Sequence, residues 1–150
     1  MKTLAFGLFI ALFSFSSLAM KLDVQSCEEN QFSLSFNSVM TMKTYSNGAI
    51  KVFELDHIEP AAVPYGVVVT LDRGAELSEM ESFCRYIPYL SWVSVKNAVS
   101  SYDPTTNTLK LKMPARQFNP DTSLFEEKTL TIQVVKGART AEGTVLAELN

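Results

Sequence analysis

The chain of 150 residues is 47% hydrophobic and 19% charged, which is too apolar for a disordered protein and too short for more than one ordinary domain. Its 13 Lys and Arg residues are outnumbered by 16 Asp and Glu residues. Nucleic-acid binders normally carry a basic excess that neutralises phosphates, so this class is disfavoured. With 1 histidine and 2 cysteines, the chain cannot supply the ligand set of a structural zinc site, and we expect neither a metal nor a cofactor.

Residues 1–19 have the pattern of a cleavable secretion signal. A basic start is followed by the apolar stretch from Leu4 to Phe15, and small residues stand at Ser17 and Ala19, where a signal peptidase reads the chain. The apolar stretch is too short to span the roughly 30 Å hydrocarbon core as a helix, so no stable membrane insertion is expected after cleavage. The signal pattern predicts export to the periplasm or secretion. We expect residues 20–150 to form a single exported domain, which the patterns described below indicate to be β-rich.

Both cysteines, Cys27 and Cys84, lie in the predicted mature domain. An even pair in an oxidising compartment most simply forms one disulfide, and no Cys-x-x-Cys spacing suggests a redox-active pair. We therefore expect a structural disulfide between Cys27 and Cys84.

Alternation of apolar and polar residues, typical of half-buried strands, dominates from Met20 onward. The pair Asn47-Gly48 precedes a second alternating run and readily supplies the positive φ angles of a tight hairpin turn. The segment Asp56–Tyr65 contains two prolines and is expected to be a loop. It leads into the β-branched run Val67–Leu71, which resembles a central strand.

One amphipathic helix is expected from Ala75 to Tyr86, because apolar residues recur there at spacings of three and four between acids and serines. Pro88 would limit it, since the residue before a proline is disfavoured in the α region. The following segment, Leu90–Ser101, is expected to form a strand.

The turn-forming cluster Asp103–Asn107 leads into the strictly alternating run Leu109–Met113, which predicts a second hairpin. Pro114–Glu127 shows little periodicity and contains two prolines, so it is expected to be a long irregular loop. Thr129–Val135 and Thr144–Leu149 are the last predicted strands.

About eight strands joined mainly by short turns favour a mainly β fold, an antiparallel β-sandwich or barrel with one short helix. The alternative is an α+β layer in which the helix packs on an antiparallel sheet.

His57 is the only place where an imidazole stands among carboxylates, in Asp56-His57-Ile58-Glu59. It is a weak catalytic candidate, because no nucleophile motif accompanies it and a solvated loop histidine is the ordinary interpretation. Carboxylates in the predicted helix and at Glu126 and Glu127 could pair as in glycosidases, although acids near a helix N-terminus are commonly explained by the macrodipole.

Aromatic and arginine side chains, the types that dominate binding hot spots, gather in two places. Core packing is the competing interpretation for the first group, and passive connection for the second. The candidate binding residues are Arg85, Tyr86, Tyr89 and Trp92 in the first group and Arg116 and Phe118, with Phe125, in the long loop.

No glycine-rich phosphate loop, dinucleotide fingerprint or calcium loop is found in the sequence. The leading functional hypothesis is a non-enzymatic exported domain that binds a protein or another envelope ligand through strand edges or the candidate residues. The alternatives are a small secreted hydrolase using His57 with nearby carboxylates and a structural component of an envelope assembly.

Overall fold

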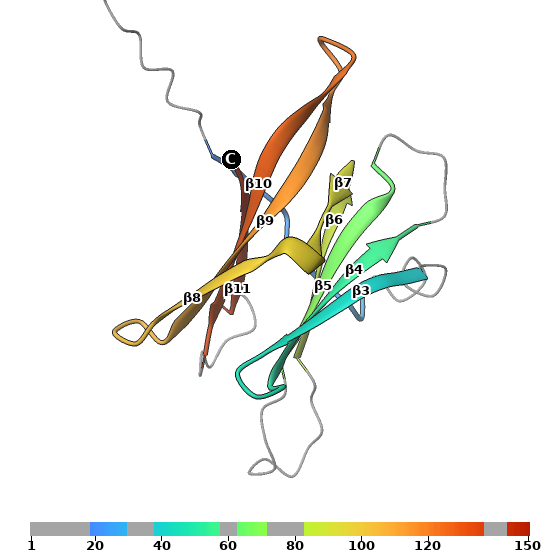
Figure 1. The fold of residues 1–150 in the computed structure, drawn as a ribbon. Helices are drawn as coiled ribbons and strands as arrows, with labels where there is room; N and C mark the ends of the chain where they lie inside the picture. The colour runs from blue at the N-terminus through green and yellow to red at the C-terminus, as the bar shows by residue number, and fades with distance from the viewer. Residues whose placement is uncertain (1–18, 30–37, 58–62, 72–82, 137–143) are drawn as a thin grey trace, which may run out of the picture.

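A computed structural model of the chain describes residues 19–29, 38–57, 63–71, 83–136 and 144–150. In these residues the chain is mainly β, and its strands form two antiparallel sheets packed face to face (Figure 1). The predicted fold class is confirmed, and of the two architectures expected from the sequence the structure has the sandwich.

The six-stranded sheet follows the order β1-β11-β10-β9-β7, and β8 also pairs with β9. Its strands are β1 (Met20–Lys21), β7 (Trp92–Val93), β8 (Val99–Asp103), β9 (Thr108–Asn119), β10 (Leu124–Val135) and β11 (Val145–Leu149). The five-stranded sheet follows the order β2-β6-β5-β4-β3. Its strands are β2 (Gln25–Ser26), β3 (Ser38–Tyr45), β4 (Ile50–Asp56), β5 (Tyr65–Leu71) and β6 (Phe83–Leu90).

The core lies between the sheets because the strands alternate as the sequence indicates. On β9 the side chains of Leu109, Leu111, Met113 and Ala115 are buried, and the residues between them are more exposed. On β10 the buried partners are Leu130, Ile132 and Val134. Successive side chains of a strand point to opposite faces, so this period places one set in the core and the other on the outer face of the sheet.

The two predicted hairpin turns are confirmed. Tyr45 pairs with Ile50 across the first turn, in which Asn47 and Gly48 have φ angles of 56° and 90°. Asp103 pairs with Thr108 across the second turn, where the Oδ1 atom of Asp103 accepts a hydrogen bond from the backbone N–H of Thr105 at 2.9 Å. Short polar side chains and glycine tolerate these backbone conformations, which is why the local sequence predicted them well.

The predicted helix from Ala75 to Tyr86 is wrong where the structure tests it. Phe83–Tyr86 belongs to strand β6, and residues 75–82 lie outside the described residues. Apolar side chains at Phe83, Tyr86 and Ile87 match a helical spacing, but they also suit a strand whose two faces are both covered. The only helical turn among the described residues is the 3-10 helix Val95–Asn97.

The predicted strand Leu90–Ser101 is also divided. β6 ends at Leu90, the chain bends at Ser91, and β7, the 3-10 helix and β8 follow in the other sheet. The segment therefore crosses from one sheet to the other, which explains its less regular pattern of apolar residues.

The expected long loop Pro114–Glu127 is instead the distal part of the β9–β10 hairpin. Antiparallel pairing runs without interruption from Val135 opposite Thr108 to Leu124 opposite Asn119. The connecting turn occupies only residues 120–123, and Figure 1 shows the hairpin end extending past the other strands. Pro114 has no N–H to donate, and none is needed here: the Ser94 carbonyl oxygen accepts from the Asn97 N–H at 3.2 Å instead, while the Pro114 carbonyl oxygen accepts from the Ser94 N–H at 3.0 Å.

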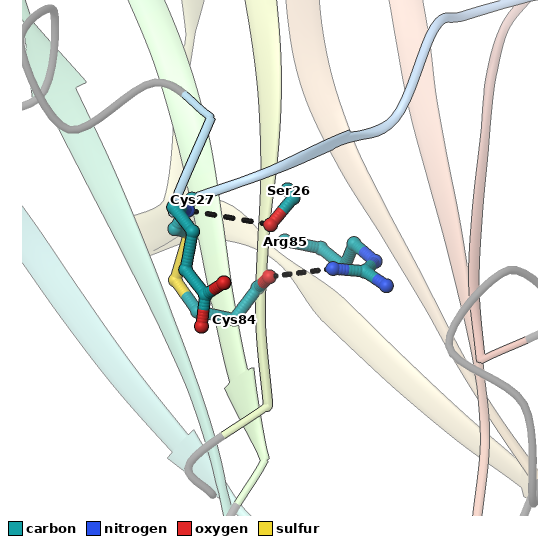
Figure 2. Close-up of a disulfide and its surroundings, with 5 residues drawn as sticks. Ser26, Cys27, Cys84 and Arg85 are labelled. Atoms are coloured by element: carbon teal, nitrogen blue, oxygen red, sulfur yellow. Dashed lines mark hydrogen bonds between the residues drawn. A yellow bond between two sulfur atoms is a disulfide. The ribbon is translucent and has the colours of Figure 1, made fainter.

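The predicted disulfide between Cys27 and Cys84 is present, with the Cα atoms 5.5 Å apart (Figure 2). It ties the segment after β2 to β6 on the outer face of the five-stranded sheet. A second, smaller apolar cluster forms around it, consisting of Cys27, Leu55, Val68 and Tyr86 with Phe53 and Cys84 packed against them. The sandwich is thus apolar on part of an outer face as well as between its sheets.

Candidate functional site

The passage of the chain between the two sheets positions Trp92. Ser91 is 7% exposed and makes two hydrogen bonds to β9. Its N–H donates to the carbonyl oxygen of Arg116 at 3.2 Å, and its Oγ accepts from the N–H of Phe118 at 2.8 Å. These bonds hold β7 against the edge of β9, where Trp92 lies opposite Arg116.

The outer face of the hairpin end carries a cluster of aromatic and charged side chains, which we call the hairpin surface. Residues directly opposite in an antiparallel pair share one face of the sheet, so the strand register gives its membership. Trp92 and Glu127 both lie opposite Arg116, and Phe125 lies opposite Phe118. The hairpin surface consists of Trp92, Arg116, Phe118, Phe125 and Glu127.

Specific contacts organise the hairpin surface. The guanidinium carbon of Arg116 lies 5.3 Å from the centre of the Trp92 ring, and its Nε lies 2.6 Å from Oε1 of Glu127. The rings of Phe118 and Phe125 meet edge to face with centroids 5.4 Å apart. Arginine stacked on an aromatic ring and T-shaped ring pairs are each favourable by about 1 kcal/mol, so these side chains are partly preordered.

The surface remains accessible. Phe125 is 59% exposed, and the Arg116 side chain is 50% exposed. An exposed ion pair such as Arg116–Glu127 contributes at most about 1 kcal/mol, so its charges stay available to another molecule. An apolar patch bordered by charge and raised on a projecting ribbon is typical of a contact surface rather than of a reaction chamber.

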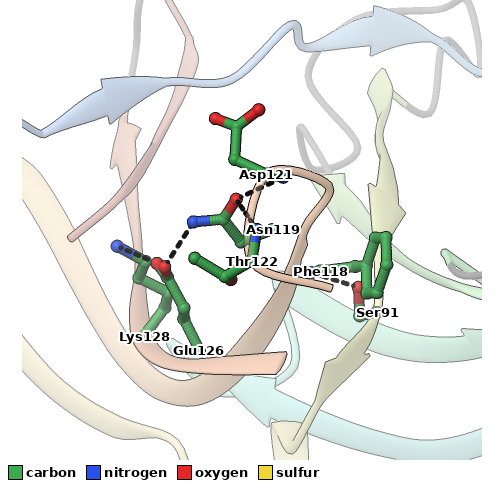
Figure 3. Close-up of polar contacts among 7 residues, drawn as sticks. All are labelled: Ser91, Phe118, Asn119, Asp121, Thr122, Glu126 and Lys128. Carbon is green, nitrogen blue, oxygen red and sulfur yellow. Dashed lines mark hydrogen bonds and ion pairs between the residues drawn. The ribbon is translucent and has the colours of Figure 1, made fainter. Parts of the chain in front are cut away.

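A polar network on the opposite face holds the hairpin end together (Figure 3). The Asn119 side-chain Nδ2 donates to Oε1 of Glu126 at 2.7 Å, and its Oδ1 accepts from the Asp121 N–H at 2.9 Å. Lys128 lies 3.2 Å from Oε2 of Glu126. The hydrogen bonds from Asn119 and Lys128 lower the pKa of Glu126 below its usual value, so the carboxylate remains charged. A two-stranded ribbon is only marginally stable by itself, and this network stabilises its tip.

Tyr89 is the one candidate outside the hairpin surface that stands in the open. It is 65% exposed, and its φ angle of 64° lies in the left-handed region. The pairing of β5 with β6 shifts between Tyr65 opposite Leu90 and Val67 opposite Ile87, so Pro88 and Tyr89 form a bulge. A bulky residue at positive φ is strained. This backbone conformation directs the Tyr89 ring outward, just before the chain crosses to Trp92.

Arg85 lies elsewhere, in a groove of about 790 Å³ at the open side between the sheets. The groove is lined mainly by the segment Lys21–Ser26 together with Val145–Ala147. The guanidinium carbon of Arg85 lies 4.1 Å from the centre of the Phe83 ring, and Nη1 donates to the Cys84 carbonyl oxygen at 3.1 Å. Arg85 is therefore separate from the hairpin surface.

His57 and Tyr86 come together on the outer face of the five-stranded sheet. The Tyr86 hydroxyl lies 2.6 Å from Nε2 of His57, and Tyr86 is 3% exposed. Burial, reinforced by Tyr89, raises the pKa of Tyr86 to about 12, so the phenol is neutral and unsuited to act as a base. Its burial also leaves Tyr86 without the exposed area that a binding residue needs.

The candidate carboxylates Glu126 and Glu127 do not come together in a common site. Glu126 and Glu127 are consecutive in β10 and point to opposite faces, where Asn119 and Arg116 bind them separately. They cannot converge on one substrate bond. The acids of the predicted helix, Glu76, Glu79 and Glu81, lie outside the described residues.

No group of three or more His, Cys, Asp or Glu side chains suited to a metal ion occurs in the described part of the chain. Across the same residues, no helix is both long and apolar enough to cross a bilayer.

The sequence pointed to four members of the hairpin surface: Trp92, Arg116, Phe118 and Phe125. It does not predict their arrangement, because a loop over Pro114–Glu127 has no strand register that would set these side chains opposite one another. The overlooked signal is the turn sequence Asn119-Pro120-Asp121, flanked by outward residues Arg116 and Phe118 before it and Phe125 and Glu127 after it.

Comparison of the chain with protein families, with characterised proteins and with solved structures finds no match. Its function is therefore to be inferred from the surfaces described above.

Proposed function

We propose that the chain is a non-enzymatic, exported interaction domain that binds a protein partner through the hairpin surface. Residues 1–19 act as its cleaved signal, and the mature domain works in the periplasm or outside the cell. The Cys27–Cys84 disulfide supports an oxidising, extracytoplasmic compartment, because such bonds are rare where thiols are kept reduced.

The observation that carries the proposal is the grouping of Trp92, Arg116, Phe118 and Phe125 on one exposed face. Tryptophan, other aromatic residues and arginine are enriched at the centres of protein interfaces, where truncating one of them commonly costs more than 1 kcal/mol of binding free energy. The cluster is held by local contacts before any partner arrives, so binding sacrifices little side-chain entropy.

A protein fits this surface better than a sugar. The Phe118 and Phe125 rings meet at 61°, which gives an uneven apolar surface and not the flat platform on which a sugar ring stacks. Arg116 and Glu127 add both signs of charge at its border, as in the polar rim of a protein interface.

The test places a photo-crosslinking amino acid at position 125 in cells that export the protein. Position 51, an exposed lysine on β4 in the other sheet, is the matched control. We expect position 125 to capture a defined protein that position 51 does not capture.

The captured protein is then purified and titrated with variants. Phe125→Ala and Arg116→Ala are expected to weaken its binding by about tenfold or more, and Lys51→Ala to leave it unchanged. Equal crosslinking from both positions, or wild-type affinity of Phe125→Ala, would show that the hairpin surface is not the binding site.

A further inference from the structure

Strand β8 is an edge with few of the features that prevent strand addition. It pairs with β9 in regular register, from Val99 opposite Lys112 to Asp103 opposite Thr108. All five of its residues are exposed, with Val99 at 71% and Tyr102 at 51%. Within the described ranges no strand pairs with its other side. The strand contains no proline, lysine or bulge, which are the features that natural proteins use to block edges.

The other edges in the described part of the sandwich are short, irregular or charged. Among these residues, the stretch Leu124–Lys128 of β10 has no strand on the side away from β9, but it carries Glu126, Glu127 and Lys128. β1 and β2 have two residues each. β3 is long, but its pairing is interrupted by a bulge between Val39 and Thr41, and it carries Lys43, whose Nζ donates to the Ala98 carbonyl oxygen at 2.9 Å. β8 is therefore the edge best suited to accept another strand.

We propose that two copies of the chain pair antiparallel through β8, about a twofold axis that passes through Ser101. Opposite residues of an antiparallel pair share a face, and Val99, Ser101 and Asp103 face outward with Lys110 and Lys112. A dyad at Ser101 preserves this alternation. It sets Ser101 opposite itself, Ser100 opposite Tyr102, and Val99 opposite Asp103, and it extends the six-stranded sheet into a continuous sheet across both copies.

Charge complementarity favours a second copy in this orientation. Lys112 lies beside Val99 at one end of β8, and Asp103 lies at the other end. The twofold axis places Asp103 of each copy opposite Val99 of the other copy. Asp103 is therefore in line with Lys112, the residue that pairs with Val99 on its other side. Both charges are exposed, and the two lie two strand spacings apart, roughly 10 Å. The attraction is modest, but it acts twice and opposes a parallel arrangement that would juxtapose the acidic ends.

The interface is small, so the dimer is reversible. We expect a pair of five-residue strands to bury less than the roughly 1,200 Å² typical of stable complexes, and we expect the dimer to dissociate at about micromolar to millimolar concentrations. The dyad is perpendicular to the sheet, and Arg116 lies on the same outward face as Lys112. Both hairpin surfaces therefore face the same side, and the dimer presents two of them to a common partner.

The first test is sedimentation equilibrium of the exported, purified protein over concentrations up to about 1 mM. We expect the weight-average mass to rise from monomer toward dimer. Ser101→Lys, which puts two ammonium groups opposite each other at the dyad, is expected to weaken association at least tenfold. Thr44→Lys, which adds the same charge to exposed β3, serves as the matched control and is expected to associate like the wild type.

A crosslinking test fixes the register independently of affinity. Residues directly opposite in an antiparallel pair have Cβ atoms about 5 Å apart, so Ser101→Cys is expected to form a disulfide-linked dimer under mild oxidation. Ser100→Cys, offset from its own copy by two positions, is expected to crosslink far less. Mass mapping confirms that Cys27–Cys84 remains intact in both variants.

Monomer at every concentration together with no Ser101→Cys crosslink would overturn the proposal. So would a dimer that survives Ser101→Lys but is lost in Thr44→Lys, since the interface would then lie on β3. Preferential crosslinking of Ser100→Cys would overturn the pairing about Ser101.

Discussion

The hydroxyl of Tyr86 and the Nε2 of His57 lie 2.6 Å apart, directly above Gly66. Tyr86 belongs to β6, His57 directly follows β4, and Gly66 belongs to β5. Gly66 leaves the space that the other two side chains fill. A Cβ atom at Gly66 would lie 2.6 Å from Cε2 of Tyr86 and 3.2 Å from Nε2 of His57. The glycine is thus required by packing, and the pair completes the outer apolar cluster beside the disulfide.

Gly66→Ala is expected to destabilise the protein by about 1–3 kcal/mol, because the added methyl group overlaps the Tyr86 ring in a buried site. Urea unfolding monitored by Trp92 fluorescence measures the loss. Tyr86→Leu in the same chain should restore part of it, since the atoms that clash are removed. If the losses of unfolding free energy from Gly66→Ala and Tyr86→Leu simply add in the double variant, the clash is not the cause of the destabilisation.

The buried phenol predicts a loss of stability at alkaline pH. Because the pKa of Tyr86 is raised from 10.0 to about 12, its contribution is complete below pH 10 and is lost as the pH rises toward 12, where the unfolded state alone gains from ionisation. The loss is at most about 3 kcal/mol.

Tyr86→Phe is the variant that tests this pH dependence. The unfolding free energy of the wild type should fall more steeply between about pH 10 and pH 12 than that of Tyr86→Phe. Some slope will remain in the variant, because burial also raises the pKa of Tyr45. Parallel curves for the two proteins would refute the assignment.

Removing the disulfide is expected to lower the unfolding free energy by about 4 kcal/mol, because the bond closes a loop between residues 57 positions apart. The measurement compares the wild type with the double variant Cys27→Ser, Cys84→Ser in denaturant. Reductant should bring the wild type to the stability of the variant and should leave the variant unaffected. A variant as stable as the oxidised protein would contradict the prediction.

Asn119→Ala is expected to loosen the hairpin end. The substitution removes the acceptor for the Asp121 N–H and the donor to Glu126, at a cost of about 1–2 kcal/mol. Limited proteolysis should show faster cleavage between residues 119 and 125, with cleavage elsewhere unchanged. Thr105→Ala, in the turn between β8 and β9, is the control. A wild-type cleavage rate in Asn119→Ala would show that the network does not hold the turn.

Much of the fold could be predicted because its determinants are local. The alternation of Leu109, Leu111 and Met113 assigns one face of β9 to the core, and Asn47-Gly48 requires a turn whatever surrounds it. The spacing of Phe83, Tyr86 and Ile87 wrongly predicted a helix. The reason is that β6 has its inner face in the core and its outer face under the disulfide. A strand covered on both sides loses the period that distinguishes it from a helix.

The amino-acid sequence by itself determined a β-rich domain with an export signal pattern, two turns and a single possible disulfide pairing, since each depends on neighbouring residues or on simple counting. Only the tertiary structure decided that Trp92 joins Arg116, that Phe125 faces Phe118, and that His57 meets Tyr86 over Gly66. These contacts depend on strand register and on where the chain crosses between sheets. A one-residue change of register turns every side chain to the other face, and short-range sequence patterns do not specify it across distant strands.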